Sequence, residues 1–309
     1  MSSLGASLKR SVFKILRPDV MLHVRRLQKN KKKNALDRVR RDPQLELYSR
    51  ILRRDFLHYG YFADPAVRPE TLSFEDLEQA QLAYAELFLE ALPDSLKPGP
   101  VLDLGCGMGG LSALLQERGF KPVALSPDEH QVRYICEKHP SIETIQCKGE
   151  ELEVEKHRGR FSAVITSESL QYLKLDQALP VIEQVLRPGG KWLICDYFRT
   201  QARTHEKSGH VYSEFLQEVA RRGWRVEQDR DVTAHVLVTL RYAQMFADRL
   251  LFPLLDFAVG KLEVKQPGVA FLLKDWLPEV RSSLEQGVKT IDPSQFAQDK
   301  SYRFMVLSR

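Results

Sequence analysis

The sequence has little of what stabilises secreted or membrane-spanning chains. Its 309 residues include four cysteines, at positions 106, 136, 147 and 195, and this spacing argues against a disulfide framework or a CxxC metal site. It contains no HExxH pair, so we expect no metal. It also lacks an apolar run of about 18 residues and the apolar segment of a secretion signal. These absences predict reduced thiols, a cytoplasmic location and no membrane-spanning helix.

Acidic residues are scarce in the first 54 positions. This segment holds 16 Lys and Arg against 4 Asp and Glu, a net charge of +12, whereas residues 55–309 carry −7. Apolar residues at near-helical spacing from Leu4 to Leu16 predict a basic amphipathic helix, and a cationic run follows at 29–33. We expect residues 1–33 to contact an anionic membrane peripherally. A solvated charged tail would have the same pattern.

From residue 101 onward, short β-rich runs alternate with helical stretches. This alternation is typical of βαβ units and a parallel sheet, so we predict an α/β fold with a mostly parallel, seven-stranded sheet and helices on both faces. Strands are expected at 101–104, 122–125, 142–147, 163–166, 192–196, 224–226 and 302–307. Helices are expected at 74–92, 111–118, 128–138, 176–186 and 211–222, with a further helical pattern at 45–56.

A glycine-rich turn follows the first of these strands, where backbone N–H groups can approach a ligand closely. Two cofactor patterns compete there. Gly105, Gly107 and Gly110 fit the dinucleotide pattern G-x-G-x-x-G, whereas the other pattern, D-x-G-x-G-x-G, is formed by Asp103 with Gly105, Gly107 and Gly109. The carboxylate of Asp103 favours the second pattern, because it suits a cationic amino-acid group and would repel a pyrophosphate.

This second pattern resembles motif I of the class I S-adenosylmethionine-dependent methyltransferases. Four other segments add to this resemblance and occur in the expected order: three resemble the branch of cyclopropane fatty acid synthases and tocopherol methyltransferases, and the last resembles a turn that is frequent in methyltransferases. They are HYGYF at 58–62, LSP at 125–127, TSESLQY at 166–172 and LRPGG at 186–190. The chain is identified as a member of this family. The resemblance implies a Rossmann-like fold and S-adenosyl-L-methionine as the cofactor.

The resemblance also implies a cofactor site. The glycines would let the backbone pass beneath the cofactor, Asp103 would orient its amino-acid end, and Leu125 and Ser126 would face the adenosine. Tyr59 and Tyr61 would wall the methyl end, where aromatic rings favour a sulfonium, unless they are core packing. The full set is Tyr59, Tyr61, Asp103, Gly105, Cys106, Gly107, Gly109, Leu125, Ser126, Glu150 and Ser167.

The candidate catalytic residues are Glu168, Tyr172, His210 and Tyr59. Glu168 and Tyr172 follow the fourth strand, toward the reactive end of the cofactor. His210 could act as a base near neutral pH, although capping a helix or lying in solvent explains it as well. Where this chain has Gln171-Tyr172 the branch has Glu-His, and that His helps cyclopropane synthases to hold bicarbonate. Its absence favours simple methyl transfer.

We expect four parts: a basic helical N-terminal arm at 1–57, the Rossmann-like methyltransferase core at 58–231, a helical insertion at 232–300 and a final strand at 301–309. The insertion is rich in Leu, Val and Phe. It predicts a helical cover over an apolar pocket and hence a lipophilic acceptor. A helical layer of the core or a homodimer interface would have the same composition.

These observations favour methyl transfer to carbon or oxygen of a small, lipophilic molecule by in-line displacement. An RNA methyltransferase anchored by the basic arm is the second hypothesis. The acidic body and the absence of a base-methylating Asn/Asp-Pro-Pro-Tyr segment argue against nucleic acid as a partner. A cofactor-binding protein without catalytic activity is the third, because the Gln171-Tyr172 change keeps it open.

Overall fold

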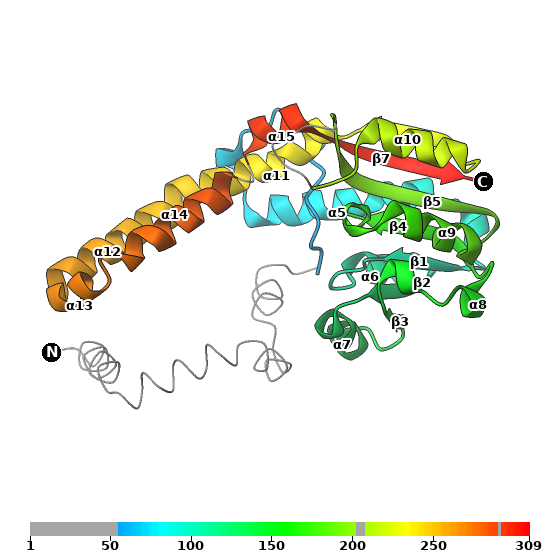
Figure 1. Ribbon diagram of the computed structural model, residues 1–309, viewed down its shortest axis with the longest axis horizontal. Coiled ribbons are helices and arrows are strands. Elements are labelled where there is room, and N and C mark those ends of the chain that lie inside the picture. Colours follow the sequence, from blue (N-terminus) through cyan, green and yellow to red (C-terminus); the bar gives the residue numbers. More distant parts are fainter. Residues whose placement is uncertain (1–54, 202–207, 290–291) are drawn as a thin grey trace. The chain divides into compact units, whose positions relative to one another are not determined.

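The computed structural model describes residues 55–201, 208–289 and 292–309 (Figure 1). The predicted helix over 4–16 lies outside these residues, as does all but the end of the helical pattern at 45–56. The described chain falls into two compact units, one of residues 55–242 and 292–309 and the other of residues 243–289. The first unit contains the sheet and the candidate site.

Seven strands form one sheet in the order β3-β2-β1-β4-β5-β7-β6. All neighbours pair in parallel except β7, which is antiparallel to both β5 and β6. The predicted fold class is therefore confirmed. The strands are β1 Pro100–Leu104, β2 Lys121–Ser126, β3 Glu143–Gln146, β4 Phe161–Ser167, β5 Leu186–Arg199, β6 Arg225–Asp231 and β7 Lys300–Ser308.

Helices follow or precede most strands of this unit. They are α5 Phe74–Ala91, α6 Gly110–Glu117, α7 Glu129–Lys138, α8 Val154–His157, α9 Leu175–Val185, α10 Tyr212–Arg221 and α15 Pro293–Asp299. Ser73 begins α5 with a capping box, because its hydroxyl accepts the Asp76 N–H while the Asp76 carboxylate accepts the Ser73 N–H. This cap fixes the start of the helix that was expected at 74–92.

The two faces of the sheet bury different side chains because successive residues of a strand point to opposite sides. Leu102 and Leu104 of β1 pack in one apolar cluster with Leu179 of α9 and Phe215 of α10. On the opposite face, Ala124 of β2 packs with α7, and α5 packs against β7. Layers on both faces leave the carboxyl ends of the parallel strands as the open edge of the sheet.

The segment between β6 and β7 is helical. It contains α11 Thr233–Phe246, α12 Phe252–Lys265, α13 Pro267–Leu272 and α14 Trp276–Lys289, followed by α15. Within the unit of residues 243–289, Arg281 of α14 forms ion pairs with Asp256 of α12 and Glu285. Among the described residues, no helix is long and apolar enough to cross a membrane.

Candidate functional site

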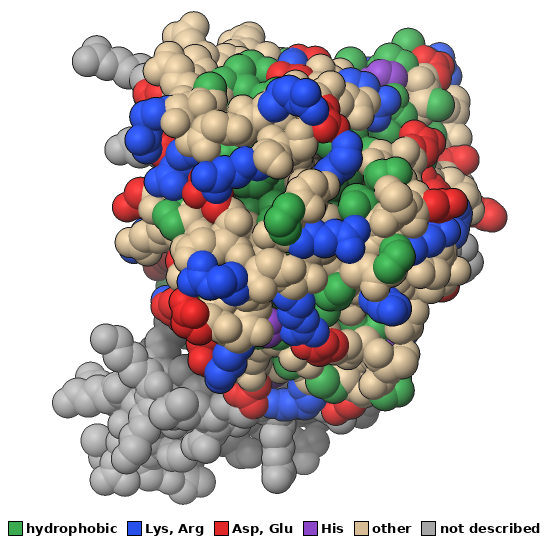
Figure 2. Space-filling model, turned by 90° about the vertical axis from the view of Figure 1, so that its right-hand side faces the viewer, with side chains coloured by type: hydrophobic (Ala, Val, Ile, Leu, Met, Phe, Trp, Pro, Cys, Tyr) green, Lys and Arg blue, Asp and Glu red, His purple; other side chains and the backbone are tan. Residues whose placement is uncertain are grey.

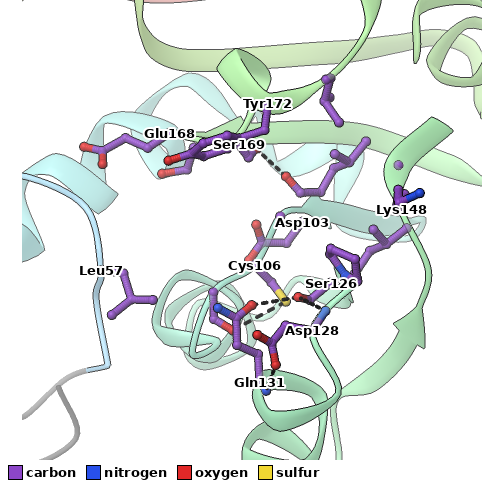
Figure 3. A pocket seen from close by; sticks show the side chains of 18 of the residues that line it. Leu57, Asp103, Cys106, Ser126, Asp128, Gln131, Lys148, Glu168, Ser169 and Tyr172 are labelled. Carbon is purple, nitrogen blue, oxygen red and sulfur yellow. Dashed lines mark hydrogen bonds between the residues drawn. The ribbon is translucent and has the colours of Figure 1, made fainter. Parts of the chain in front are cut away.

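A pocket of about 720 Å³ opens at the carboxyl ends of β1, β2 and β4 (Figure 3). This is the edge where open α/β sheets bind their ligands, and the volume is typical of small-molecule sites. Asp103 lies in the middle of the view. Glu168, Ser169 and Tyr172 lie on one side of it, and Ser126, Asp128 and Gln131 on the other.

The glycine-rich turn forms the floor between these two sides. Gly105 has φ +87° and Gly107 φ +56°, backbone conformations that favour glycine. The N–H groups of Gly105 and Cys106 both donate to the carbonyl of Leu125, which fixes the turn against β2. A side chain on Gly105 would meet Cβ of Ser169 at 2.3 Å, and one on Gly107 would meet Leu57 at 3.1 Å. Both glycines are therefore required where the backbone approaches the pocket.

Asp103 is the last acidic group before the turn. It is buried, and the hydroxyl of Ser112 on α6 donates to its Oδ2 at 2.7 Å. Burial raises the pKa of Asp103 to about 6, while the Ser112 hydrogen bond opposes the rise. A cationic group bound in the pocket would favour the charged form of this carboxyl.

The start of α7 forms the opposite wall. Asp128 caps the helix by accepting the N–H groups of His130 and Gln131. The hydroxyl of Ser126 donates to Oε1 of Gln131 and accepts the N–H of Asp128. This hydrogen-bond network fixes the positions of the Ser126, Asp128 and Gln131 side chains at the turn between β2 and α7.

Glu168 follows β4 with φ +50°, a conformation that is unusual for a residue other than glycine. Its Oε1 accepts the backbone N–H of Tyr59 at 2.8 Å and the hydroxyl of Tyr302 on β7. Burial raises the pKa of Glu168 to about 7, against the lowering effect of these two hydrogen bonds. A backbone strained at a pocket and a carboxyl that titrates near neutrality are both typical of functional sites.

A second buried carboxyl, Asp196 of β5, lies close to Glu168. It accepts the N–H groups of Gln171 and Tyr197 at 3.1 and 2.8 Å. Burial, and then the charge of Glu168, raise the pKa of Asp196 to about 8. Near neutral pH the two carboxyls therefore resist carrying two charges at once.

Two buried polar atoms at the pocket make no hydrogen bond within the described residues. They are Nε2 of His58 and Oε1 of Gln171. The His58 ring stacks on Tyr84 at 4.1 Å, and its Nδ1 lies 2.7 Å from the carbonyl of Tyr59. Burial lowers the pKa of His58 to about 4, so the ring is neutral near pH 7. Unpaired buried polar atoms are costly unless a ligand satisfies them.

The pocket brings together most of the residues predicted from the sequence. Those lining it are Asp103, Gly105, Cys106, Gly107, Leu125, Ser126, Glu150, Ser167, Glu168 and Tyr172. Glu150 also accepts the backbone N–H of Lys174, which joins two lining segments. Tyr172 is 78% exposed at the rim. The roles assigned to these residues stay predictions.

Four predicted site residues do not line this pocket, and their roles stay predictions. The ring of Tyr61 stacks on His235 of α11 at 4.6 Å, and Tyr59 reaches the site through its backbone N–H. A side chain on Gly109 would meet Ile135 of α7, so this glycine serves helix packing. His210 lines a separate hollow with Arg199, where its Nε2 bonds the carbonyl of Leu170. At all four positions, contacts with residues distant in the sequence determine where the residue lies, and the local sequence does not indicate those contacts.

Other residues at the site were missed. His58, Asp128 and Gln131 line the pocket, and Tyr302 contacts Glu168 from the far end of the chain. His58 stands in the quoted HYGYF segment, so its position was available as a signal. Nothing in the local sequence of Tyr302 links it to Glu168, 134 residues away. Across the described ranges, no three His, Cys, Asp or Glu side chains are grouped so that they could hold a metal ion.

Comparison with known families decides what kind of domain carries this site. The family model described as "Methyltransferase domain" matches residues 101–190. Over this range the chain is similar to methyltransferase domains. The resemblance inferred from the motifs is thereby confirmed, and the matched range covers the glycine-rich turn, Glu150 and Glu168.

Curated relatives of the methyltransferase domain match part of the chain. An uncharacterized methyltransferase of Alkaliphilus oremlandii is 29% identical over 36% of this chain and 53% of its own length. The 2-methyl-6-phytyl-1,4-hydroquinone methyltransferase of a Synechocystis species is 29% identical over 53% of this chain and 50% of its own length. The chain thus spans about half the length of these curated relatives.

Solved structures share the fold over a longer range. A geranyl diphosphate methyltransferase, solved with GPP and sinefungin, superposes with a TM-score of 0.61 at 18% identity. The match covers 87% of this chain and 95% of that one. At 18% identity the likeness shows a shared fold. This shared fold extends well beyond residues 101–190, the range that the family model matches.

Proposed function

We propose that the protein transfers a methyl group from S-adenosyl-L-methionine to carbon or oxygen of a small, lipophilic acceptor. The observation that carries this proposal is the pocket at the end of β1, in which the glycine turn and buried Asp103 lie opposite Glu168. When bound, S-adenosylmethionine supplies an electrophilic methyl group on a sulfonium. The residues present have the shape and the polarity to hold it.

Four features support this fit. Gly105 and Gly107 leave room where a Cβ would lie, so backbone N–H groups can approach a ligand. Asp103 offers a carboxylate to a cationic amino-acid group. Nε2 of His58 and Oε1 of Gln171 are buried acceptors that need a hydrogen-bond donor. On the other wall, Ser126 and Gln131 offer polar atoms to an adenosine.

Glu168 is the proposed general base. Glu168 lines the pocket, and its carboxylate is held by the Tyr59 N–H and the Tyr302 hydroxyl. With a pKa of about 7 it is half ionised near neutral pH, where a base both accepts a proton readily and is available in its ionised form. Glu168 would take the proton that a hydroxyl or an activated carbon loses as it gains the methyl group. Tyr172 at the rim would contact the acceptor.

A lipophilic acceptor is supported by the apolar composition of residues 232–300 and by the names of similar proteins. The Synechocystis relative is named for a phytyl hydroquinone, and the geranyl diphosphate methyltransferase for a geranyl compound. The phytyl and geranyl groups in these names are apolar chains. For this protein we propose the chemical class of the acceptor, a lipophilic molecule.

Nucleic acid is a weaker alternative. On the face shown in Figure 2, basic and acidic side chains are interspersed, whereas a nucleic-acid groove needs clustered basic charge. The cations concentrate in residues 1–54 of the sequence. A gel-shift assay with RNA at rising salt tests this alternative, because phosphate contacts weaken steeply with salt.

The test begins with cofactor binding by calorimetry. We expect the protein to bind S-adenosylmethionine and Asp103→Ala to bind it at least about tenfold more weakly, since a charge-assisted hydrogen bond contributes roughly 1.5–3 kcal/mol. Absence of binding would overturn the proposal. Turnover with labelled S-adenosylmethionine and a lipid extract then separates an active enzyme from an inactive binding protein. Labelled product in the aqueous phase alone would contradict a lipophilic acceptor.

We also propose a cytoplasmic location with peripheral contact to an anionic membrane through residues 1–33, whose basic and apolar residues alternate at helical spacing. All four cysteines are free thiols, which is typical of a reducing compartment. Homodimerisation through the apolar residues of 232–300 remains a proposal that sedimentation can test.

A further inference from the structure

Behind Glu168 lies a chain of buried hydroxyl groups that the proposed reaction does not use. Tyr302 of β7 contacts Oε1 of Glu168, and its hydroxyl oxygen lies 3.1 Å from that of Tyr84 on α5. Tyr84 in turn reaches the carbonyl of Cys195 on β5 at 3.0 Å. Both tyrosines are fully buried. The chain therefore runs from the pocket into the core without contact with solvent.

The number of hydrogen bonds in this chain depends on whether Glu168 is protonated. Three contacts join Glu168, Tyr302, Tyr84 and the Cys195 carbonyl, but the two phenols supply only two hydrogens. When Glu168 is ionised, one of the three contacts lacks a hydrogen. When Oε1 of Glu168 is protonated, all three contacts are hydrogen bonds that point in one direction, toward the Cys195 carbonyl.

The groups that face this chain come from every element packed around it. Tyr172 lies on the turn after β4, and His58 stacks on the Tyr84 ring from the chain before α5. The Cys195 thiol and Asp196 face the chain from β5, and the Ser167 hydroxyl at the end of β4 lies 3.5 Å from the Tyr84 hydroxyl. His58 is neutral near pH 7, because burial lowers its pKa to about 4. Asp196 is the one further buried carboxyl that the structure describes next to Glu168, and the charge of Glu168 helps to raise the pKa of Asp196.

We infer that Tyr302 and Tyr84 form a hydroxyl relay in which Tyr302 positions the ionised Glu168 carboxyl, and Tyr84 completes the chain of hydrogen bonds that stabilises the proton Glu168 receives during methyl transfer. In this step the bond from the acceptor atom to its hydrogen breaks and an O–H bond forms at Glu168. The phenol hydrogens then rotate into the complete arrangement, and no tyrosine O–H bond breaks. The proton leaves Glu168 for solvent after the methylated product dissociates. The inference rests on the proposed role of Glu168 as the base.

The relay predicts the effect of Tyr84→Phe on Glu168. Removing the Tyr84 hydroxyl deletes one more hydrogen bond when Glu168 is protonated than when it is ionised, and the bond that the Ser167 hydroxyl donates to Tyr84 is lost in both states. The protonated form loses more, so the pKa of Glu168 should fall, by about 0.5–1 unit for one ordinary hydrogen bond. In a Tyr302→Phe background the same substitution should not move the pKa, because the connection is already cut.

The measurement is a pH titration of full-length protein carrying ¹³C-labelled glutamate carboxyls, followed by NMR. Glu168→Gln identifies the Glu168 resonance. Tyr212→Phe is the matched control, since it removes a phenol that bonds a different carboxylate, Asp229, away from the pocket. Circular dichroism checks that each variant folds, and Tyr→Phe preserves the packed ring.

An unchanged or raised pKa of Glu168 in Tyr84→Phe would overturn the relay. So would a shift that persists when the Tyr302 hydroxyl is absent. Because the titration needs neither cofactor nor acceptor, its outcome is independent of the turnover assay. Cofactor binding and methyl transfer can therefore hold while the relay fails, and the relay can hold in a protein that transfers no methyl group.

Discussion

At the scale of single residues, Gly107 tests whether backbone approach is what the glycine turn provides. It lines the pocket with φ +56°, and an added Cβ would lie 3.1 Å from Leu57. We expect Gly107→Ala to lose about 1 kcal/mol of unfolding free energy, because an L side chain is strained at positive φ. We also expect at least about tenfold weaker cofactor binding, since the turn must shift away from the ligand.

Gly119 supplies the control for this substitution. It has φ +82°, but an added Cβ there meets nothing within 4 Å. Gly119→Ala should therefore lose similar stability in a denaturant titration while calorimetry finds unchanged cofactor affinity. Equal loss of affinity in both variants would show that backbone strain, and not approach to the pocket, is responsible.

Glu168 makes a second residue-scale prediction, about stability and pH. Its pKa is raised from 4.5 to about 7 in the folded protein, so the folded state binds a proton more tightly than the unfolded state. The stability this provides is complete below about pH 4.5 and is lost as pH rises through about 7. The unfolding free energy should therefore fall between about pH 5 and pH 8.

Glu168→Gln removes this titration and keeps the acceptor atom that Tyr59 and Tyr302 bond. Between about pH 5 and pH 8 we expect the variant to lose roughly 2 kcal/mol less than the natural protein in urea unfolding. Asp103 and Asp196 have raised pKa values too, so some pH dependence should remain. Parallel pH curves for the two proteins would contradict the raised pKa of Glu168.

At the scale of elements, the N-terminus of α7 couples a helix cap to the pocket. Asp128 accepts two N–H groups there, and the same turn holds Ser126 and Gln131 at the pocket wall. We expect Asp128→Ala to lose about 1 kcal/mol of stability, as lost caps do. Cofactor affinity should fall as well, because the wall is no longer fixed.

Asp292 provides a matched comparison. It caps α15 in the same way, by accepting the N–H groups of Ser294 and Gln295, and it does not line the pocket. Asp292→Ala should therefore lose similar stability in thermal unfolding and retain cofactor affinity. If both variants lose affinity, general destabilisation and not the α7 wall explains the effect.

Elements also show where sequence reasoning succeeds and where it fails. The strands β1, β2 and β4 are predicted well because they are buried apolar runs bounded by turns. The strand β6 was expected at 224–226 but extends over Arg225–Asp231, a polar stretch. As an edge strand it pairs only with β7, so its side chains need not be apolar. Local pattern cannot detect such pairing.

The candidate site likewise contains residues that the sequence could predict and residues that it could not. Residues on the turn after β1 and at the ends of β2 and β4 could be predicted, since strand ends in a parallel sheet converge. The ring of Tyr61 could not, because His235 on α11 holds it away from the pocket. Tyr302 could not either, because only the antiparallel insertion of β7 beside β5 brings its hydroxyl to Glu168.

At the scale of the whole molecule, the net charge differs between the segment before the pocket and the part of the chain that contains it. The pocket lies entirely in residues 55–177, within a part of the chain whose net charge is negative. The excess of Lys and Arg precedes it, in residues 1–54. A cationic segment outside the pocket is suited to holding the protein at an anionic surface, where a lipophilic acceptor would be concentrated.

Vesicle binding tests this separation. Lys31, Lys32 and Lys33 lie in the cationic run of the sequence, and each lysine near an anionic bilayer contributes about 1 kcal/mol. Replacing the three with Gln should weaken flotation with phosphatidylglycerol vesicles by roughly 100-fold at low salt and leave cofactor affinity unchanged. Replacing Lys97, Lys148 and Lys156 of the body changes the net charge equally and should leave flotation intact. If both triple variants lose vesicle binding equally, net charge and not the position of the lysines explains the effect. If the natural protein does not bind the vesicles, the proposed membrane contact is refuted.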